Sequence, residues 1–233
     1  MKRRHTARRP RKSLSQIRRS RLERLENRHL LAAGPWYELT ELSSASQYQA
    51  GDGAQDVAVS SDIIVVGARK AEGASTTNSG KVYIYGRDDG GSPTDLGDDT
   101  WSITQELAPD DLSDGDYFGH SLALDGDTLV VGAWHPTEVC CPNPELGDGY
   151  GVAYVYRFNT ASDSWELEQK LSPSSYGGLD DAFGRNVDVE GDIIVIGARG
   201  YDDASGLVDR GAAYVFRHDG LAWQQETRLL ASN

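Results

Sequence analysis

A unit of about 65 residues occurs three times in the chain, and this repeat restricts the possible folds more than any other feature. Its clearest marker is an apolar string that ends in Gly-Ala: IIVVGA at 63–68, LVVGA at 129–133 and IIVIGA at 193–198. The glycines Gly67, Gly132 and Gly197 are spaced 65 residues apart, and an aspartate precedes each string. Such a period predicts an array of similar supersecondary units.

Each unit contains four short stretches of strand character, separated by turns rich in Gly, Asp and Ser. The first alternates, with the apolar pairs Val57/Val59, Leu122/Leu124 and Val187/Val189. The Gly-Ala string is second, and its apolar run is typical of a strand covered on both faces. A tyrosine-rich stretch is third, and the fourth begins at a tryptophan: Trp36, Trp101, Trp165 or Trp223. Four antiparallel strands in each unit predict an all-β fold made of propeller blades.

The glycines and tryptophans of the repeat carry structural expectations of their own. Asp125-Gly126-Asp127 and Glu190-Gly191-Asp192 separate the first two stretches, where glycine permits the positive φ of a tight hairpin. The glycine of each Gly-Ala string is expected to allow a close backbone approach where a side chain would clash. The regularly placed tryptophans are expected to pack between blades, because each buries a large apolar area.

A two-residue motif in two of the units resembles a known repeat family. Phe118-Gly119 and Phe183-Gly184 each lie 14 residues before the alanine of a Gly-Ala string. This spacing resembles the FG-GAP repeat, which forms the β-propeller at the head of integrin α chains and of many bacterial surface proteins. The proline of that signature is replaced here by Arg69, Trp134 and Arg199, and Gly53-Ala54 stands where the first Phe-Gly is expected. The resemblance implies an extracellular interaction module.

The strand count predicts three full blades, at about 43–110, 111–173 and 174–231, within a repeat region that spans 34–233. A further strand at 36–42 is left over in front of the first blade. Closed propellers have 4–8 blades, so three blades leave apolar faces and strand edges without a neighbour. We therefore expect either a truncated reading frame or a chain that associates with copies of itself through its open blade edges.

The first 33 residues form a strongly basic segment, with 12 Lys and Arg against 2 Asp and Glu. Its longest apolar run, 30–33, is too short for the core of an ordinary signal peptide. Leu25, Glu26, Arg28, Leu30 and Leu31 resemble the L-E-P-R-x-L-L segment of planctomycete surface and secreted proteins. We interpret 1–33 as a targeting segment, disordered or helical, of a secreted or cell-surface bacterial protein. A solvated tail and a nucleic-acid-binding arm are the alternatives.

Residues 34–233 are acidic, with 34 Asp and Glu against 11 Lys and Arg, a balance of −23. An acidic surface repels nucleic acid and anionic membranes, so neither is an expected partner of this region. Its apolar runs are also far shorter than the ~20 residues of a spanning helix, which argues against membrane insertion.

No cofactor is expected, although the integrin resemblance implies calcium. Calcium takes 6–8 oxygen ligands, and the D-x-D-x-D-G-x-x-D loop that supplies them in the family is absent here. Acidic residues cluster elsewhere, at Asp110, Asp111, Asp114, Asp116, Asp180, Asp181, Asp202, Asp203 and Asp209. Two interpretations stay open: solvated loops that keep the protein soluble, or a calcium site. Cys140 and Cys141 are likewise either two surface thiols or a strained vicinal disulfide.

Catalysis has little support in the sequence, and we expect no enzyme. Neither a G-x-S-x-G nucleophile motif nor a phosphate-binding glycine loop is present. His120 follows a Phe-Gly pair, but the matching residue of the next unit is Arg185, which favours an exposed loop over a ligand. The enzymatic alternative is a secreted hydrolase that acts on polysaccharide through acidic loop residues.

The loops that follow the Gly-Ala strands are the candidate binding surface. They span 70–79, 134–149 and 200–209, and they vary in length and sequence between units while the strands keep the frame constant. Because they follow equivalent strands, they are expected to share one face of the array. We predict that this face binds an extracellular protein or a glycan, with Trp134, His135 and Tyr201 as candidate contacts.

Overall fold

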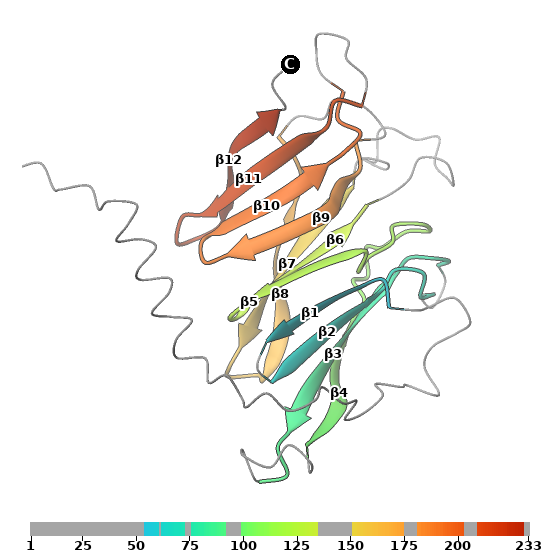
Figure 1. The fold of residues 1–233 in the computed structure, drawn as a ribbon, viewed down its shortest axis with the longest axis vertical. Coiled ribbons are helices and arrows are strands. Elements are labelled where there is room, and N and C mark those ends of the chain that lie inside the picture. The colour runs from blue at the N-terminus through green and yellow to red at the C-terminus, as the bar shows by residue number, and fades with distance from the viewer. Residues whose placement is uncertain are drawn as a thin grey trace, which may run out of the picture. The chain divides into compact units, whose positions relative to one another are not determined.

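The computed structural model describes residues 54–60, 62–72, 76–91, 99–134, 151–174, 181–202 and 209–230 (Figure 1). Several expectations fall outside these ranges and keep the status of predictions: the basic segment 1–33, the strand at 36–42, the state of Cys140 and Cys141, and the role of His135.

Twelve strands in the described residues form three four-stranded antiparallel sheets, which we call blades 1, 2 and 3 (Figure 1). Blade 1 contains β1 (Asp56–Ser60), β2 (Ile63–Ala68), β3 (Lys81–Asp88) and β4 (Thr100–Leu107). Blade 2 contains β5 (Ser121–Asp125), β6 (Thr128–Ala133), β7 (Val152–Asn159) and β8 (Ser164–Leu171). Blade 3 contains β9 (Phe183–Glu190), β10 (Ile193–Ala198), β11 (Ala212–His218) and β12 (Trp223–Leu230). The all-β prediction with three four-stranded blades is confirmed.

The local turn chemistry explains why each blade is a simple meander. Every strand pairs with the next one in the chain, so the order within each sheet follows the sequence. The hairpins between the first two strands of blades 2 and 3 turn at Gly126 (φ 60°) and Gly191 (φ 61°), as the sequence predicts.

No helix long and apolar enough to cross a membrane occurs in the described part of the chain.

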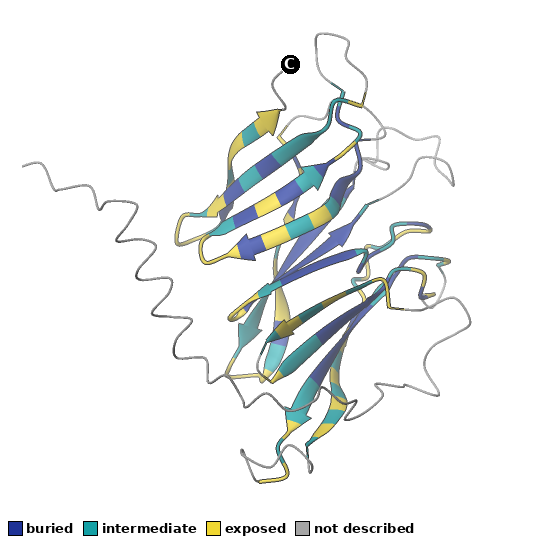
Figure 2. Ribbon diagram, in the orientation of Figure 1, coloured by how far each residue is buried: buried dark blue, intermediate teal, exposed yellow. Residues whose placement is uncertain are grey.

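The first strand of each blade packs against the blade before it, since β5 contacts β1 and β2, and β9 contacts β5, β6 and β7. Burial follows from this order (Figure 2). All six residues of β6, in the middle blade, are buried, whereas β10 of blade 3 is buried at alternate positions only. The expectation of a second strand covered on both faces is therefore met fully only where a blade has a neighbour on each side.

A glycine contact closes each junction between blades. A Cβ atom on Gly67 would overlap the backbone oxygen of Gly119, and one on Gly132 would overlap that of Gly184. Gly119 and Gly184, the glycines of the two Phe-Gly pairs, both have a φ of +82°. The Gly-Ala string of one blade and the Phe-Gly pair of the next blade therefore meet across the junction. This confirms the predicted close approach and shows that its partner is the Phe-Gly pair of the next blade.

The outer strands of neighbouring blades are joined by glutamine side chains that hydrogen-bond to a tryptophan backbone. Gln105 donates to the carbonyl of Trp165 (2.9 Å) and accepts from its N–H (2.8 Å). Gln169 makes the same pair of bonds to Trp223, at 2.9 and 2.8 Å. Both indole rings are buried in the apolar clusters between blades, as predicted for these tryptophans. Each junction therefore combines a glycine contact, an apolar layer and a glutamine clamp.

The aspartate that precedes each Gly-Ala string binds an arginine on the third strand of the same blade. A carboxylate from the start or the bulge of the fourth strand contacts the same guanidinium. The three sets are Asp62–Arg87–Asp99, Asp127–Arg157–Glu168 and Asp192–Arg217–Glu226, with N–O distances of 2.6 to 3.1 Å. These ion pairs raise the pKa of Arg87 and Arg217, because each guanidinium donates hydrogen bonds to the carboxylates. The sequence shows the aligned aspartates, but their partners become clear only in the fold.

Candidate functional site

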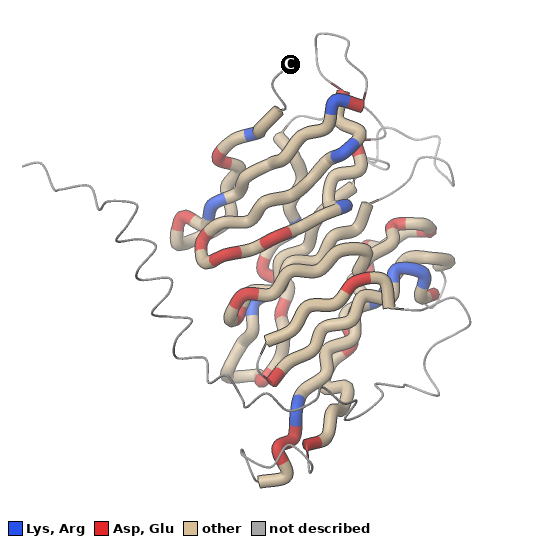
Figure 3. Tube along the Cα trace, in the orientation of Figure 1, with Lys and Arg blue, Asp and Glu red and all other residues tan. Residues whose placement is uncertain are grey.

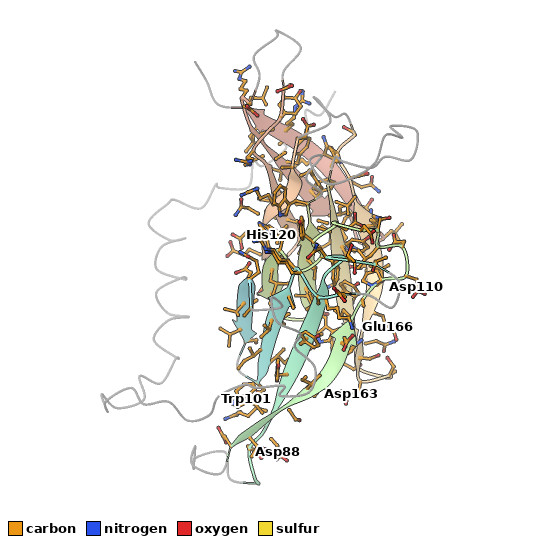
Figure 4. All side chains as sticks on the ribbon, turned by 90° about the vertical axis from the view of Figure 1, so that its right-hand side faces the viewer. Asp88, Trp101, Asp110, His120, Asp163 and Glu166 are labelled. Carbon is orange, nitrogen blue, oxygen red and sulfur yellow. The ribbon has the colours of Figure 1, made fainter. Side chains whose placement is uncertain are left out.

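Five side chains from three blades meet where the strands run into the loops of the predicted binding face. Arg69 follows β2, Tyr117 and His120 precede β5, Trp134 follows β6, and Arg185 lies in β9. We call this group the arginine–aromatic cluster. The glycine contacts at the Phe-Gly pairs fix it in place, because the blade junctions run directly beside it. His120 is labelled in Figure 4, above the strands of blade 1.

The cluster alternates guanidinium groups and aromatic rings. Cζ of Arg185 lies 4.2 Å from the ring centroid of Trp134, and Cζ of Arg69 lies 5.6 Å from that of Tyr117. The rings of His120 and Trp134 meet edge to face at 5.2 Å, while Tyr117 stacks on Trp134 at 6.1 Å. Cation–π contacts of this kind contribute about 0.5–2 kcal/mol each, depending on desolvation. The rings therefore hold both arginines close to the surface of the junction.

His120 is held in its neutral form by this environment. Burial, together with the charges of Arg69 and Arg185, lowers its pKa to about 4. Nδ1 of the neutral ring lies 3.5 Å from a guanidinium nitrogen of Arg69, in position to accept a hydrogen bond. The sequence-based expectation of an exposed loop at His120 was wrong. The residue is half-buried because Arg185 of blade 3 and Trp134, which follows β6, lie close to it.

We expect the imidazole of His120 to titrate near pH 4, well below its ordinary pKa of about 6.5. The unfolded chain takes up the proton from about pH 6.5 downward, whereas the folded chain does so only near pH 4. Stability should therefore fall as the pH decreases through this window, and His120→Gln should remove that part of the dependence. An NMR titration of the ring protons, assigned with the variant, measures the midpoint. A midpoint above pH 6 would contradict the proximity of the two guanidinium groups.

The structure describes two of the three contacts predicted from the sequence. Trp134 is half-buried inside the cluster, and its ring N–H is buried without a hydrogen-bond partner among the described residues. Tyr201 is buried against Tyr214, with the guanidinium of Arg228 4.4 Å from its ring centroid. Both rings therefore pack where these loops begin. Their roles in binding stay predictions, as does that of His135, which lies outside the described ranges.

Several acidic loop residues make specific structural bonds. Asp111 binds Nζ of Lys170 (2.9 Å) and accepts a hydrogen bond from the hydroxyl of Tyr154 (3.2 Å). Asp114 accepts a bond from the backbone of Thr77, at 2.8 Å. Within the described ranges, no group of three or more His, Cys, Asp and Glu side chains has a geometry suited to a metal ion. The question of calcium binding therefore stays open.

Sequence reasoning missed the two arginines of the cluster. In the sequence, Arg69 stands out only as a replacement for proline, and Arg185 only as the counterpart of His120. Arg69 stands apart from the strand arginines, because no ion pair with a carboxylate of the described residues includes it. Acidic residues otherwise line many strand ends and turns (Figure 3). The signal in the sequence is the residue after each Gly-Ala string, which is Arg69, Trp134 or Arg199. Arg69 and Trp134 lie against His120 and Arg185, the residues that follow the Phe-Gly pair of the next blade.

The fold and its junctions define a protein built of propeller-type blades. At each junction, the Gly-Ala string of one blade contacts the Phe-Gly pair of the next. The family of the FG-GAP repeat matches residues 101–156 and 165–216. The chain is an FG-GAP repeat protein, which confirms the resemblance. Repeats of this family are typical of extracellular or cell-surface proteins and are generally non-enzymatic.

Comparisons with individual proteins add little to this assignment. Among solved structures, the crystal structure of the Saccharomyces cerevisiae Sqt1 is similar, with 9% sequence identity and a TM-score of 0.43. The match covers 78% of this chain and 36% of that chain, so the chain spans about a third of the length of Sqt1. No curated protein matched the sequence.

Proposed function

We propose that the chain is a non-enzymatic interaction module of the cell surface or the extracellular space. It binds a carboxylate-bearing partner through the loop ends of its blades, at the arginine–aromatic cluster. The observation that carries the proposal is the environment of Arg69. Arg87, Arg157 and Arg217 are each neutralised by two carboxylates, whereas the described contacts of Arg69 are the rings of Tyr117 and His120.

The chemistry of the cluster selects the class of ligand. A guanidinium group pairs with a carboxylate through charge-assisted hydrogen bonds, and neighbouring aromatic faces accept the apolar part of the same ligand. An acidic glycan and an acidic peptide segment of an extracellular protein both offer this combination. The negative balance of residues 34–233 does not prevent such binding at physiological salt, where charges separated by more than about 8 Å are largely screened.

The experiment measures binding of the full chain by isothermal titration calorimetry in buffer of physiological ionic strength. Its two arms use polygalacturonate and a poly-glutamate peptide, with dextran as the uncharged polymer. We expect one acidic probe to bind and Arg69→Gln to weaken that binding at least tenfold, since one charge-assisted pair to a carboxylate contributes about 1.5–3 kcal/mol. The arm that responds identifies the partner as a glycan or a protein.

Arg217→Gln is the matched control, because Arg217 is an exposed arginine of blade 3 whose charge is already paired with Asp192 and Glu226. It removes the same charge and should leave the affinity unchanged. Equal losses in Arg69→Gln and Arg217→Gln would mean that only the overall charge matters. Binding of dextran with the same affinity as the acidic probes would contradict the carboxylate as the recognised group.

A further inference from the structure

The junction between blades 1 and 2 is hollowed where their outer strands meet. A groove of about 410 Å³ lies between the segment that links β4 to blade 2 and the strands β7 and β8. Its apolar lining includes Leu107, Pro109, Tyr156 and Leu167, and we call it the Leu167 groove. Leu167 is the most exposed of these residues, at 52%, and it also lines a second hollow of similar size beside the β7–β8 turn. An exposed leucine therefore lies between two hollows.

A glutamine closes the equivalent place at the junction between blades 2 and 3. Gln225 of β12 has the ladder position that Leu167 has in β8. Its side-chain oxygen accepts a hydrogen bond of 2.8 Å from the backbone N–H of Ser174, in the segment that leaves blade 2. Pro173 of that segment is buried, whereas its counterpart Pro109 is only half-buried. A leucine cannot accept such a bond, so the Leu167 groove stays open.

The groove also contains a tyrosine hydroxyl. Tyr156 is only 5% exposed, yet no hydrogen bond of its hydroxyl group occurs among the described residues. Burial and the nearby charge of Asp111 raise the pKa of Tyr156, so the hydroxyl keeps its proton and can donate a hydrogen bond. An apolar lining with one such donor suits a peptide, which brings both apolar side chains and backbone carbonyl acceptors.

The rim of the groove is acidic. Glu106 and Asp111 line it, and each of them binds a lysine of a neighbouring strand. Asp110 lines it as well, and no ion pair of the described residues includes this carboxylate. On the other side of Leu167, Glu166 lines the second hollow and accepts hydrogen bonds only from neutral side chains near the β7–β8 turn. Asp110 and Glu166, both labelled in Figure 4, are therefore negative charges without a cationic partner in the described chain.

We propose that the Leu167 groove binds a basic peptide segment of a partner protein, with an aliphatic side chain against Leu167 and a lysine or arginine on either side of it. Charge complementarity selects this partner, because Asp110 and Glu166 attract cationic side chains and repel acidic ones. The apolar contact adds the affinity that exposed charge pairs lack. This site is separate from the arginine–aromatic cluster, which has the opposite charge. Binding of acidic probes at the cluster and of basic peptides at the groove are therefore independent tests.

Fluorescence anisotropy of a labelled peptide, titrated with the full chain at physiological ionic strength, tests the proposal. The peptide has one leucine flanked by lysines, and two control peptides replace the leucine by serine or the lysines by glutamates. We expect the first peptide to bind roughly tenfold more tightly than either control, because it combines the apolar contact with the charge pairs. Equal affinity for the serine peptide would overturn the proposal, since only the net charge of the chain would then attract the probe.

Leu167→Gln gives β8 the residue type that β12 has at Gln225. The new side chain should accept the backbone N–H of Asp110, as Gln225 accepts that of Ser174, and should weaken peptide binding roughly tenfold. Leu221→Gln is the matched control, because Leu221 is 93% exposed in the turn before β12 and lines neither hollow. It should leave the affinity unchanged. Equal affinities of the two variants would contradict the groove as the binding site.

Asp110→Asn tests the charge on the rim. It should weaken peptide binding roughly two- to fivefold and make the affinity less dependent on salt, as expected for one exposed charge pair. Asp163→Asn is its control, because Asp163 is exposed in the turn before β8 and lines neither hollow. Equal effects of the two changes would argue against a specific contact at Asp110. Sedimentation velocity of the chain alone examines the rival occupant: self-association that Leu167→Gln abolishes would assign the groove to a second copy and refute the peptide.

Discussion

Replacing Gly132 with alanine is expected to destabilise the protein by about 3 kcal/mol, at the upper end of the usual cost of overpacking. The added Cβ would overlap the backbone oxygen of Gly184 and the hydroxyl of Ser121, which itself donates to that oxygen at 2.8 Å. A backbone atom in a strand cannot move away as a flexible side chain can. For a domain of this size, the loss corresponds to a fall in Tm of roughly 6–12 °C.

Gly197→Ala is the control for this prediction, because Gly197 occupies the same position in blade 3. A Cβ there would meet only atoms of Asn186, the nearest at 3.5 Å, which is an ordinary contact. Thermal melts of the two variants and the unaltered chain measure the difference. Similar losses in both variants would mean that alanine perturbs the strand itself and that the junction is not the cause.

Phe183→Ala is expected to cost about 3–5 kcal/mol, the usual range for removing a fully buried aromatic ring. Phe183 is 0% exposed and meets the rings of Tyr214 and Phe216 edge to face, at 5.3 and 6.2 Å. Urea unfolding followed by tryptophan fluorescence measures the effect, because the nearby Trp223 is buried in the same cluster. The variant should also lose cooperativity between blades 2 and 3, since the Phe-Gly pair carries the junction glycine.

Phe183→Leu separates the loss of volume from the loss of the ring contacts. Leucine refills most of the space, so this variant should cost only about 1 kcal/mol. If Phe183→Ala were as stable as Phe183→Leu, the phenylalanine of the repeat signature would have no packing role. The same comparison at Phe118, whose ring meets Tyr154 at 5.2 Å, would show whether the two junctions behave alike.

The sequence was sufficient to predict the blade and most of its internal design. Strand positions follow from alternation and from the Gly-Ala strings, and Gly126 and Gly191 adopt the predicted positive φ. These features are local, because each depends on residues close together in the chain. Even the close approach at Gly132 could be inferred, since a glycine that recurs inside an apolar strand needs a steric reason.

The remaining features depend on which blade lies next to which. Val130 and Val195 are the same residue at the same repeat position, yet one is fully buried and the other is 37% exposed. His120 and Arg69 belong to different blades and meet only because the junction places the start of blade 2 beside the end of β2 in blade 1. Comparison of equivalent positions within a repeat cannot find such contacts, because they join positions that are not equivalent.

The meander order has a consequence for how the chain is made. Because each strand pairs with its immediate neighbour in sequence, a blade can be completed as soon as its own residues have left the ribosome. At about 5–20 residues per second, a new unit emerges roughly every 3–13 seconds. Blade 2 then covers the apolar surface of blade 1 within seconds of its synthesis, and blade 3 does the same for blade 2. Co-translational assembly should therefore shorten the time for which the apolar faces at these two junctions are exposed to aggregation.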